Sequence, residues 1–444
     1  MKILFVSLGC DKNLVDSEHM LGKLAGRGFS MTDDETEADV IIINTCCFID
    51  SAKEESIQTI LDLARMKQEG VCKALIVTGC MAERYKKEVL KEIPEVDAIV
   101  GTSSYDKIEE AIRSACSGEK AALFDDLNRM PEGEHKRIMT TGGCYEYLKI
   151  AEGCDKHCTY CVIPSLRGAY RSVPMEDLLV EARALAEDGV RELILVAQET
   201  TCYGKDLYGQ KSLHVLLKKL CGIPGIRWIR ILYCYPEEIY PELVQTIKEE
   251  PKICHYLDLP IQHASDRILK RMGRKTSRGD LERIIGNLRQ EIPDIALRTT
   301  LITGFPGETP ADHIELMDFV SRMRFDRLGV FTYSREEGTP AAEMDGQVDS
   351  GTMQSRRDEL LTMQQEISKE RGESFQGKTL EVQIEGEIPE DHTFVGRTYA
   401  DAPNVDGYFF VHSEEPLHTG DFVSARATGA MEYDLIGEYT GEVL

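Results

Sequence analysis

Three cysteines stand close together in the segment AEGCDKHCTYCVIP, namely Cys154, Cys158 and Cys161. A structural zinc site usually has four protein ligands, commonly as two separated pairs, and no fourth cysteine or histidine stands at a matching spacing here. Iron–sulfur clusters, in contrast, bind cysteine thiolates in short runs of this kind. Three thiolates on a four-iron cluster leave one iron free for another ligand, as a catalytic cluster requires.

A zinc knot is the alternative for these cysteines, which the ligand count disfavours although His157 lies inside the loop. Tyr160 stands directly before the last cysteine, and we expect its ring to cover the cluster.

A second set of cysteines, Cys10, Cys46 and Cys80, is spread along the first part of the chain. Each ends an apolar run, and the spacings of 36 and 34 residues correspond to one strand–helix unit each. The carboxyl ends of parallel strands meet at one edge of a sheet, so these thiols should converge. We predict a second three-cysteine iron–sulfur cluster with an open iron; three coincidentally placed cysteines are the alternative.

Residues next to this second set are interpreted separately. Cys47 follows Cys46 directly and should point to the other side of the strand, so it is left out of the cluster. Asn13 and Asp16 either line the crevice or, in the case of Asp16, cap a helix.

Alternating strands and helices must position both cysteine sets, which predicts an α/β protein. Residues 1–127 form the first predicted domain, whose continuous apolar runs indicate a parallel sheet covered by helices on both faces. Residues 128–143 are polar and are interpreted as a linker. The predicted strands are residues 2–10, 39–46, 73–80 and 97–104.

Residues 144–375 repeat the alternation and end in a charged helix at about 353–374. Six strand–helix units predict a full or partial α/β barrel, with its chemistry at the carboxyl ends of the strands. The predicted strands are residues 147–153, 192–198, 228–234, 256–260, 296–304 and 327–333.

The final stretch, residues 376–444, changes in character. Apolar and polar residues alternate there with Gly and Pro in between, which predicts a small antiparallel β-barrel. It contains 14 acidic and three basic residues. Such a surface either keeps the protein soluble or docks a basic protein.

Composition limits the possible functions further. The chain has 444 residues and a net charge of −25, which argues against holding duplex nucleic acid through its phosphates. It has 14 cysteines, begins without a cleavable signal and lacks an apolar run of about 20 residues. These features favour a cytoplasmic protein whose cysteines serve metal binding or catalysis, with no membrane contact.

The CxxxCxxC motif after the first strand of the second domain resembles the signature of the radical S-adenosylmethionine (SAM) superfamily. With the second cysteine set and the final barrel, the whole chain resembles its methylthiotransferase family. That family has an N-terminal methylthiotransferase domain, a radical SAM partial barrel and a TRAM β-barrel. Four segments are similar to the branch that modifies small-subunit ribosomal protein twelve: SLGCDKNLVDSE, VAQETTCYGKDLY, YLDLPIQHASDRILKRMGR and RFDRLGVFTYSREEGTPAA.

The resemblance implies transfer of a methylthio group to the β-carbon of one aspartate of that ribosomal protein. It implies two 4Fe-4S clusters and two SAM molecules, one as radical source and one as methyl donor. The cluster on Cys154, Cys158 and Cys161 would bind SAM, and the cluster on the other cysteine set would hold sulfur or methylthiolate, so all six cysteines are catalytic.

The same resemblance implies several partners. They are the basic ribosomal protein, free or in the small subunit, an electron donor such as flavodoxin or ferredoxin, and a sulfur donor. Contact with RNA is expected to be secondary.

Polar residues and glycines near the ends of barrel strands are candidates for binding SAM. Glycine lets the backbone approach a ligand, whereas glutamine and arginine suit a carboxylate or a ribose. An ordinary polar group at a strand end is the alternative for each. With the Tyr160 ring, the candidates are Gln198, Gln262, Arg271, Gly304 and Gly307.

Two other functions remain open at this point. A transfer-RNA (adenosine) methylthiotransferase of the same family would be expected to carry a basic final barrel, because RNA binding needs phosphate contacts. A non-catalytic iron–sulfur electron carrier would need neither an open iron nor a long α/β barrel.

Overall fold

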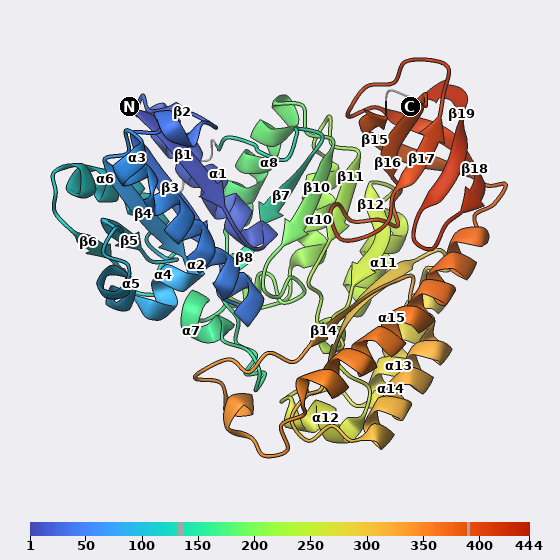
Figure 1. Ribbon diagram of the computed structural model, residues 1–444. Coiled ribbons are helices and arrows are strands. Elements are labelled where there is room, and N and C mark those ends of the chain that lie inside the picture. The colour runs from blue at the N-terminus through green and yellow to red at the C-terminus, as the bar shows by residue number, and fades with distance from the viewer. Residues whose placement is uncertain (132–136, 389–390) are drawn as a thin grey trace.

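The computed structural model describes residues 1–131, 137–388 and 391–444, which form two parallel sheets and a closed barrel (Figure 1). The predicted fold class is therefore confirmed. Residues 132–136 of the predicted linker 128–143 lie outside the described residues. The exact domain boundaries stay predictions.

The first sheet consists of six parallel strands, and its central strands are completely buried, as expected for apolar strands covered on both faces. The predicted strands are present but shorter, because each apolar run continues into the turn that follows it. The two short edge strands were not predicted. In spatial order the strands are β2 (Ser30–Met31), β1 (Lys2–Ser7), β3 (Val40–Thr45), β4 (Ala74–Gly79), β5 (Ala98–Val100) and β6 (Ala121–Leu123).

Helices cover this sheet, and α1 (Asp11–Gly26) also packs against strand β7 (Tyr145–Lys149) of the second sheet. This helix is therefore the main contact between the first two units. The other helices of the first unit are α2 (Asp50–Ala64), α3 (Met66–Glu69), α4 (Cys80–Tyr85), α5 (Lys87–Glu92) and α6 (Ile108–Cys116).

The second sheet is a partial barrel of six parallel strands, with β7 and β14 at its two open edges. A short separate pair, β8 (Ala151–Glu152) and β9 (Arg171–Ser172), interrupts the strand predicted at 147–153. In spatial order the strands are β14 (Arg327–Thr332), β13 (Ala296–Thr303), β12 (Ile253–Asp258), β11 (Trp228–Ile231), β10 (Glu192–Val196) and β7.

Helices form the outer layer of this partial barrel and bury its largest apolar cluster. The last one, α15 (Ser350–Glu373), starts three residues earlier than predicted because the Asp349 carboxylate accepts the Thr352 N–H as a cap. The others are α7 (Ile163–Arg167), α8 (Met175–Glu187), α9 (Lys205–Tyr208), α10 (Leu213–Cys221), α11 (Pro241–Glu249), α12 (Asp266–Arg271), α13 (Arg278–Glu291) and α14 (Pro310–Met323).

The third unit is a closed five-stranded barrel. Its neighbours are antiparallel except for one parallel pair, because a ring with an odd number of strands cannot alternate direction throughout. The last strand was not predicted, since its alternation is broken by glycines. In order around the barrel the strands are β15 (Thr379–Ile388), β16 (Thr393–Arg397), β17 (Phe409–His412), β19 (Leu435–Val443) and β18 (Phe422–Ala430).

Part of the acidity of this barrel serves to dock it on the second unit. Arg227 of the partial barrel pairs with Glu381 at 2.7 Å, and Arg298 pairs with Asp406 at 3.4 Å. Asp401 pairs with Arg327 in the same way. The acidic residues available for an outside partner are therefore fewer than the sequence suggests. No helix in the described ranges is both long and apolar enough to cross a lipid bilayer.

A fully buried ion triad forms the centre of this interface. Glu192 of β10 accepts Arg230 Nε at 2.7 Å on one carboxylate oxygen and Arg397 Nη2 at 2.7 Å on the other. Burial opposes ionisation of Glu192, but the two arginines outweigh it and lower the pKa of this carboxyl. The folded protein thus holds Glu192 ionised between two units that are far apart in sequence.

We predict that Glu192→Gln lowers the free energy of unfolding by about 3–5 kcal/mol, because it leaves buried Arg230 without its counter-charge and leaves Arg397 paired with Glu385 alone. Urea unfolding followed by circular dichroism measures this loss. Because the pKa of Glu192 is depressed in the folded state, its contribution is present above the ordinary glutamate pKa of about 4.3 and fades as pH falls below it. Glu381→Gln, at the half-exposed pair with Arg227, is the control and should cost at most about 1 kcal/mol.

Candidate active site with two cysteine sets

The structure brings Cys10, Cys46 and Cys80 together at one edge of the first sheet. Cys10 precedes α1, Cys46 directly follows β3, and Cys80 opens α4 directly after β4. Cys46 and Cys80 are buried, whereas Cys10 is exposed. Their convergence is what parallel strands with cysteines at their carboxyl ends predict.

Glycines make this convergence possible. Gly9 and Gly79 adopt positive φ angles of +90° and +89°, which L side chains rarely take. A Cβ atom at Gly9 would lie 2.6 Å from Cys46 Cβ, and one at Gly79 would lie 2.2 Å from Asn44 Oδ1. Gly9 and Gly79, which directly precede Cys10 and Cys80, therefore form the turns that direct these cysteines into the site.

Burial controls the protonation of these thiols. It raises the pKa of Cys46 to about 12, with a further contribution from the neighbouring Cys80, whose own pKa is also raised by burial. Without a metal these two groups are neutral thiols near pH 7. Binding of a metal centre must therefore release protons.

Cys154, Cys158 and Cys161 lie together in the loop between β8 and α7. The Lys156 N–H donates to Cys154 Sγ at 3.4 Å, and the Ile163 N–H donates to Cys161 Sγ at 3.5 Å. Burial raises the pKa of Cys154 to about 11 and that of Cys161 to about 12. Backbone N–H groups that point at sulfur suit thiolates that carry negative charge in a cluster.

Within the described residues, the cysteines are not arranged as a site for a single metal ion. Across residues 1–131, 137–388 and 391–444, no three His, Cys, Asp or Glu side chains are arranged around one point as for a single metal ion. A zinc knot needs thiolates at about 2.3 Å from one ion. The thiolates of a four-iron cluster bind different irons and stand farther apart, and the choice between zinc and a cluster stays a prediction.

Tyr160 and two glutamines remain suitable neighbours of a bound ligand. The Tyr160 ring packs edge-on against Phe305, with a centroid distance of 6.4 Å, beside the cysteine loop. Gln198 donates from Nε2 to Glu152 at 2.6 Å, whereas its Oε1 is buried and accepts no hydrogen bond within the described residues. Gln262 Oε1 is likewise buried and accepts no hydrogen bond within the described residues. Such atoms suit a polar ligand above the partial barrel.

The other SAM candidates have structural partners already. Arg271 donates from Nε to Pro306 O at 3.0 Å and from Nη2 to Asp345 O at 3.1 Å. A Cβ atom at Gly304 would lie 2.1 Å from Met353 Cγ, and one at Gly307 would lie 3.1 Å from Arg271 Cζ. These close approaches explain the residues without a ligand, so their role in binding SAM stays a prediction.

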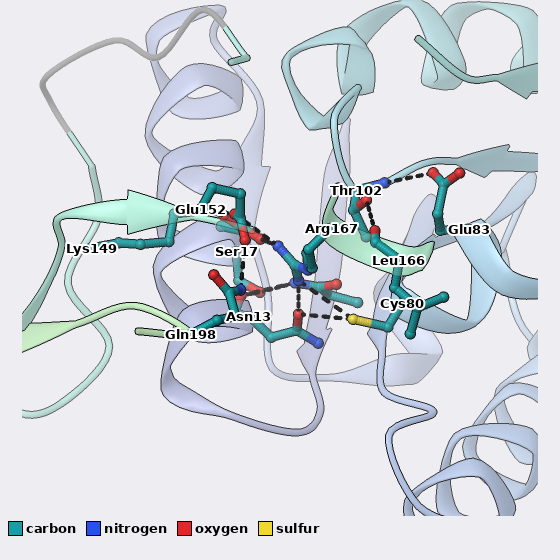
Figure 2. Close-up of polar contacts among 12 residues, drawn as sticks. Asn13, Ser17, Cys80, Glu83, Thr102, Lys149, Glu152, Leu166, Arg167 and Gln198 are labelled. Atoms are coloured by element: carbon teal, nitrogen blue, oxygen red, sulfur yellow. Dashed lines mark hydrogen bonds and ion pairs between the residues drawn. The ribbon is translucent and has the colours of Figure 1, made fainter. Parts of the chain in front are cut away.

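Sequence reasoning missed a buried ion network between the first two units (Figure 2). The Arg167 guanidinium donates from Nη1 to Asp16 at 2.7 Å and to Glu152 at 3.1 Å. Lys149 donates to Glu152 at 2.7 Å and also to Asp16. Asp16 thus belongs to an ion network between the two units, and the helix-cap alternative is wrong because α1 begins five residues earlier. The sequence feature that could have indicated this network is Arg167, the arginine that follows CVIPSL.

Asn13 also belongs to this network. Its Nδ2 donates to Thr45 O at 2.9 Å, and its Oδ1 accepts a hydrogen bond from Arg167. Cys47 is buried in the apolar core of the first unit, and its exclusion from the cluster stays a prediction.

A cavity of about 470 Å³ opens beside the first cysteine set, and residues of all three units line it. Cys10 and Asp11 come from the first unit, Tyr233 and Arg298 from the partial barrel, and Asn404 from the final barrel. The Tyr233 hydroxyl donates to Asp11 at 3.0 Å, which ties the first unit to the end of β11. Cys10, the exposed cysteine of the set, therefore faces a cavity that is large enough for a side chain.

Comparison with protein families matches all three units. The description "Uncharacterized protein family UPF0004" matches residues 2–101, the Radical SAM superfamily matches residues 148–320, and the TRAM domain matches residues 377–439. Among solved structures, TsrM from Kitasatospora setae, a radical S-adenosylmethionine methyltransferase, superposes with a TM-score of 0.56 at 14% identity, covering 77% of this chain and 76% of that one. OxsB, a cobalamin-dependent radical enzyme, gives 0.51 at 13% identity over 83% and 56%. These likenesses concern the fold.

Full-length relatives carry the name ribosomal protein uS12 methylthiotransferase RimO. The protein of Lachnoclostridium phytofermentans is 62% identical, covering 98% of this chain and 99% of that one. Those of Acetivibrio thermocellus and Clostridioides difficile are 51% and 49% identical, covering 99% and 100% of both chains, respectively. This chain therefore belongs to the RimO family of ribosomal protein uS12 methylthiotransferases, within the radical SAM superfamily.

Proposed function

We propose that this enzyme transfers a methylthio group to the β-carbon of one aspartate of ribosomal protein uS12. The observation that carries the proposal is 62% identity over nearly the whole length to a relative with that name. The two converging cysteine sets support it, because the reaction needs one centre for radical formation and another for sulfur.

Membership of the radical SAM superfamily accounts for one 4Fe-4S cluster and for SAM. We further propose two clusters. Cys154, Cys158 and Cys161 would hold the one that binds SAM, and Cys10, Cys46 and Cys80 would hold the other. When bound, these groups supply a carbon-centred radical and a transferable methylthio group; the protein residues position them and exclude water.

The cavity beside Cys10 is the proposed entrance of the target side chain. Two cations stand near it, each paired within the protein: Arg298 with Asp258 at 3.0 Å and with Asp406 at 3.4 Å, and Lys12 with Asp11 at 3.0 Å, beside the Tyr233 ring. Cationic groups there suit the carboxylate of a substrate aspartate. The carboxylates beside them suit basic side chains of a ribosomal protein.

The partners and compartment follow from this chemistry. Radical formation needs an electron donor such as flavodoxin or ferredoxin, and each turnover consumes sulfur from a donor. A ribosomal substrate places the reaction in the cytoplasm, with RNA contact at most secondary. The transfer-RNA alternative has weaker support, because the exposed charged side chains of the final barrel are mainly acidic.

The cysteine sets can be separated by iron content and product mass. Reconstituted native protein should bind about eight irons as two four-iron clusters. Replacing Cys10, Cys46 and Cys80 by alanine should leave about half of the iron, retain SAM cleavage and abolish methylthiolation of uS12, measured as intact mass. Replacing the other set should abolish cleavage as well.

A comparison of cells that contain this protein with cells that lack it identifies the substrate. Their uS12 should differ by one methylthio group, whereas their transfer-RNA nucleosides should be identical in mass. Zinc in place of iron, one cluster in native protein, or a changed nucleoside would contradict the proposed function.

Gln262 tests the proposed SAM site. Its φ angle is +69°, so asparagine, which tolerates positive φ, is the least disruptive replacement. Gln262→Asn withdraws the buried amide from the ligand and should weaken SAM binding by about 1–3 kcal/mol, roughly 5- to 150-fold, in titration calorimetry of the holoenzyme. Gln364→Asn, at a buried glutamine of α15 that donates to Phe325 O, is the control. Equal affinities for both variants would remove Gln262 from the site.

The exposed acids of the final barrel test substrate docking. Glu385 pairs with Arg397 at 2.6 Å and is unsuitable, whereas Glu387, Glu414 and Glu438 are exposed. Reversing these three to lysine should raise the apparent KM for uS12 and weaken its dependence on salt, because electrostatic steering acts on association. Steady-state kinetics at several ionic strengths measures both effects.

A matched triple reversal on the first unit, Glu54→Lys, Glu55→Lys and Glu88→Lys, changes the net charge equally at exposed positions. It should leave KM near the native value. If both triple variants behave alike, the acidity of the final barrel only contributes to solubility.

A further inference from the structure

Arg167 lies between the two cysteine sets. It ends α7, which begins two residues after Cys161, and its Nη2 donates to Cys80 Sγ at 3.5 Å (Figure 2). The same nitrogen donates to Asn13 Oδ1, and Nη1 reaches Asp16 and Glu152 at 2.7 and 3.1 Å. One guanidinium thus joins a ligand of the first set to the chain that carries the second.

The position of this guanidinium is strongly determined. The Leu166 carbonyl accepts the Thr102 hydroxyl at 2.6 Å, which fastens α7 to the first unit (Figure 2). Arg167 is only 3% exposed, so its hydrogen bonds do not compete with water. A rigid planar fork with several donors can satisfy Asp16, Glu152 and the sulfur at once, which a lysine ammonium cannot do with the same geometry.

The charges of the network are balanced without the cysteine. Lys149 and Arg167 provide two positive charges, and Asp16 and Glu152 provide two negative ones. A Cys80 thiolate bound to iron therefore adds negative charge beside a guanidinium that already points at it. Hydrogen bonds to cluster sulfurs and nearby charge are main determinants of cluster potentials.

We propose that Arg167 is a positioning residue for the N-terminal iron–sulfur cluster: it fixes the Cys80 ligand through an N–H···S hydrogen bond and raises the reduction potential of that cluster. The direction follows because reduction adds an electron, and a nearby positive charge stabilises the more negative state. The inference depends on the proposed function only in requiring a cluster on Cys10, Cys46 and Cys80.

A redox titration of the reconstituted holoenzyme, followed by electron paramagnetic resonance, tests this role. The signal of the N-terminal cluster is assigned in a full-length variant with alanine at Cys154, Cys158 and Cys161. Arg167→Gln should shift the midpoint potential of the N-terminal cluster to a lower value and alter its spectrum.

Removing one buried cation could prevent folding, so a charge-balanced variant accompanies it. In the double variant Glu152→Gln/Arg167→Gln, the remaining Asp16–Lys149 ion pair has no net charge. The guanidinium that donates to Cys80 is absent from this variant. Its midpoint should lie below that of Glu152→Gln alone. Arg137→Gln is the matched control, because Arg137 is a buried arginine of the same interface that pairs with Glu18, Glu146 and Glu181. Its midpoint should stay at the native value.

A native midpoint and spectrum in folded Arg167→Gln, or in the balanced variant relative to Glu152→Gln, would overturn the inference. An equal shift in Arg137→Gln would do the same, since the effect would then reflect general loosening of the interface. Absence of a second cluster by iron analysis would instead refute the proposed function, so the two failures are distinguishable.

Discussion

The structure depends on a buried ionic contact between helix α1 and the start of the partial barrel. Asp16 of α1 is held by Lys149 of β7 and Arg167 of α7, and Glu152 completes the group. Breaking such a group by removal of one partner leaves an uncompensated buried charge, which is strongly destabilising. The contact therefore fixes the first unit at one orientation to the second, and with it the relative placement of the two cysteine sets.

A second buried triad does the same for the final barrel. Glu192, Arg230 and Arg397 are all fully buried and join β10, β11 and β16. Residues of all three units line the cavity beside Cys10, so this cavity requires both the Asp16 network and the Glu192 triad to hold the units together. Charge pairing thus specifies the assembly of the site, whereas apolar packing within each unit stabilises the separate folds.

Much of this arrangement could be predicted from sequence, because periodic patterns report local structure directly. Cys46 and Cys80 end continuous apolar strands, and strand order places such ends side by side. The edge strands β2 and β6 and the last strand β19 were not predicted, because short or glycine-containing strands have no clear period. The Arg167 network was missed for a different reason. Its members Asp16 and Arg167 are 151 residues apart, and their pairing follows from domain docking, which no local pattern encodes.

The long sequence separation within this network has a consequence for synthesis of the protein. A ribosome completes Cys10, Cys46 and Cys80 well before it adds Lys149, Glu152 and Arg167. Because domains generally fold from the N-terminus during translation, the first unit can form while Asp16 still faces water. Cys80, at the same edge of the sheet, is then still without its Arg167 partner. Emergence of α7 then places the Arg167 guanidinium against Asp16 and Cys80, so the order of residues along the chain determines when this network can form.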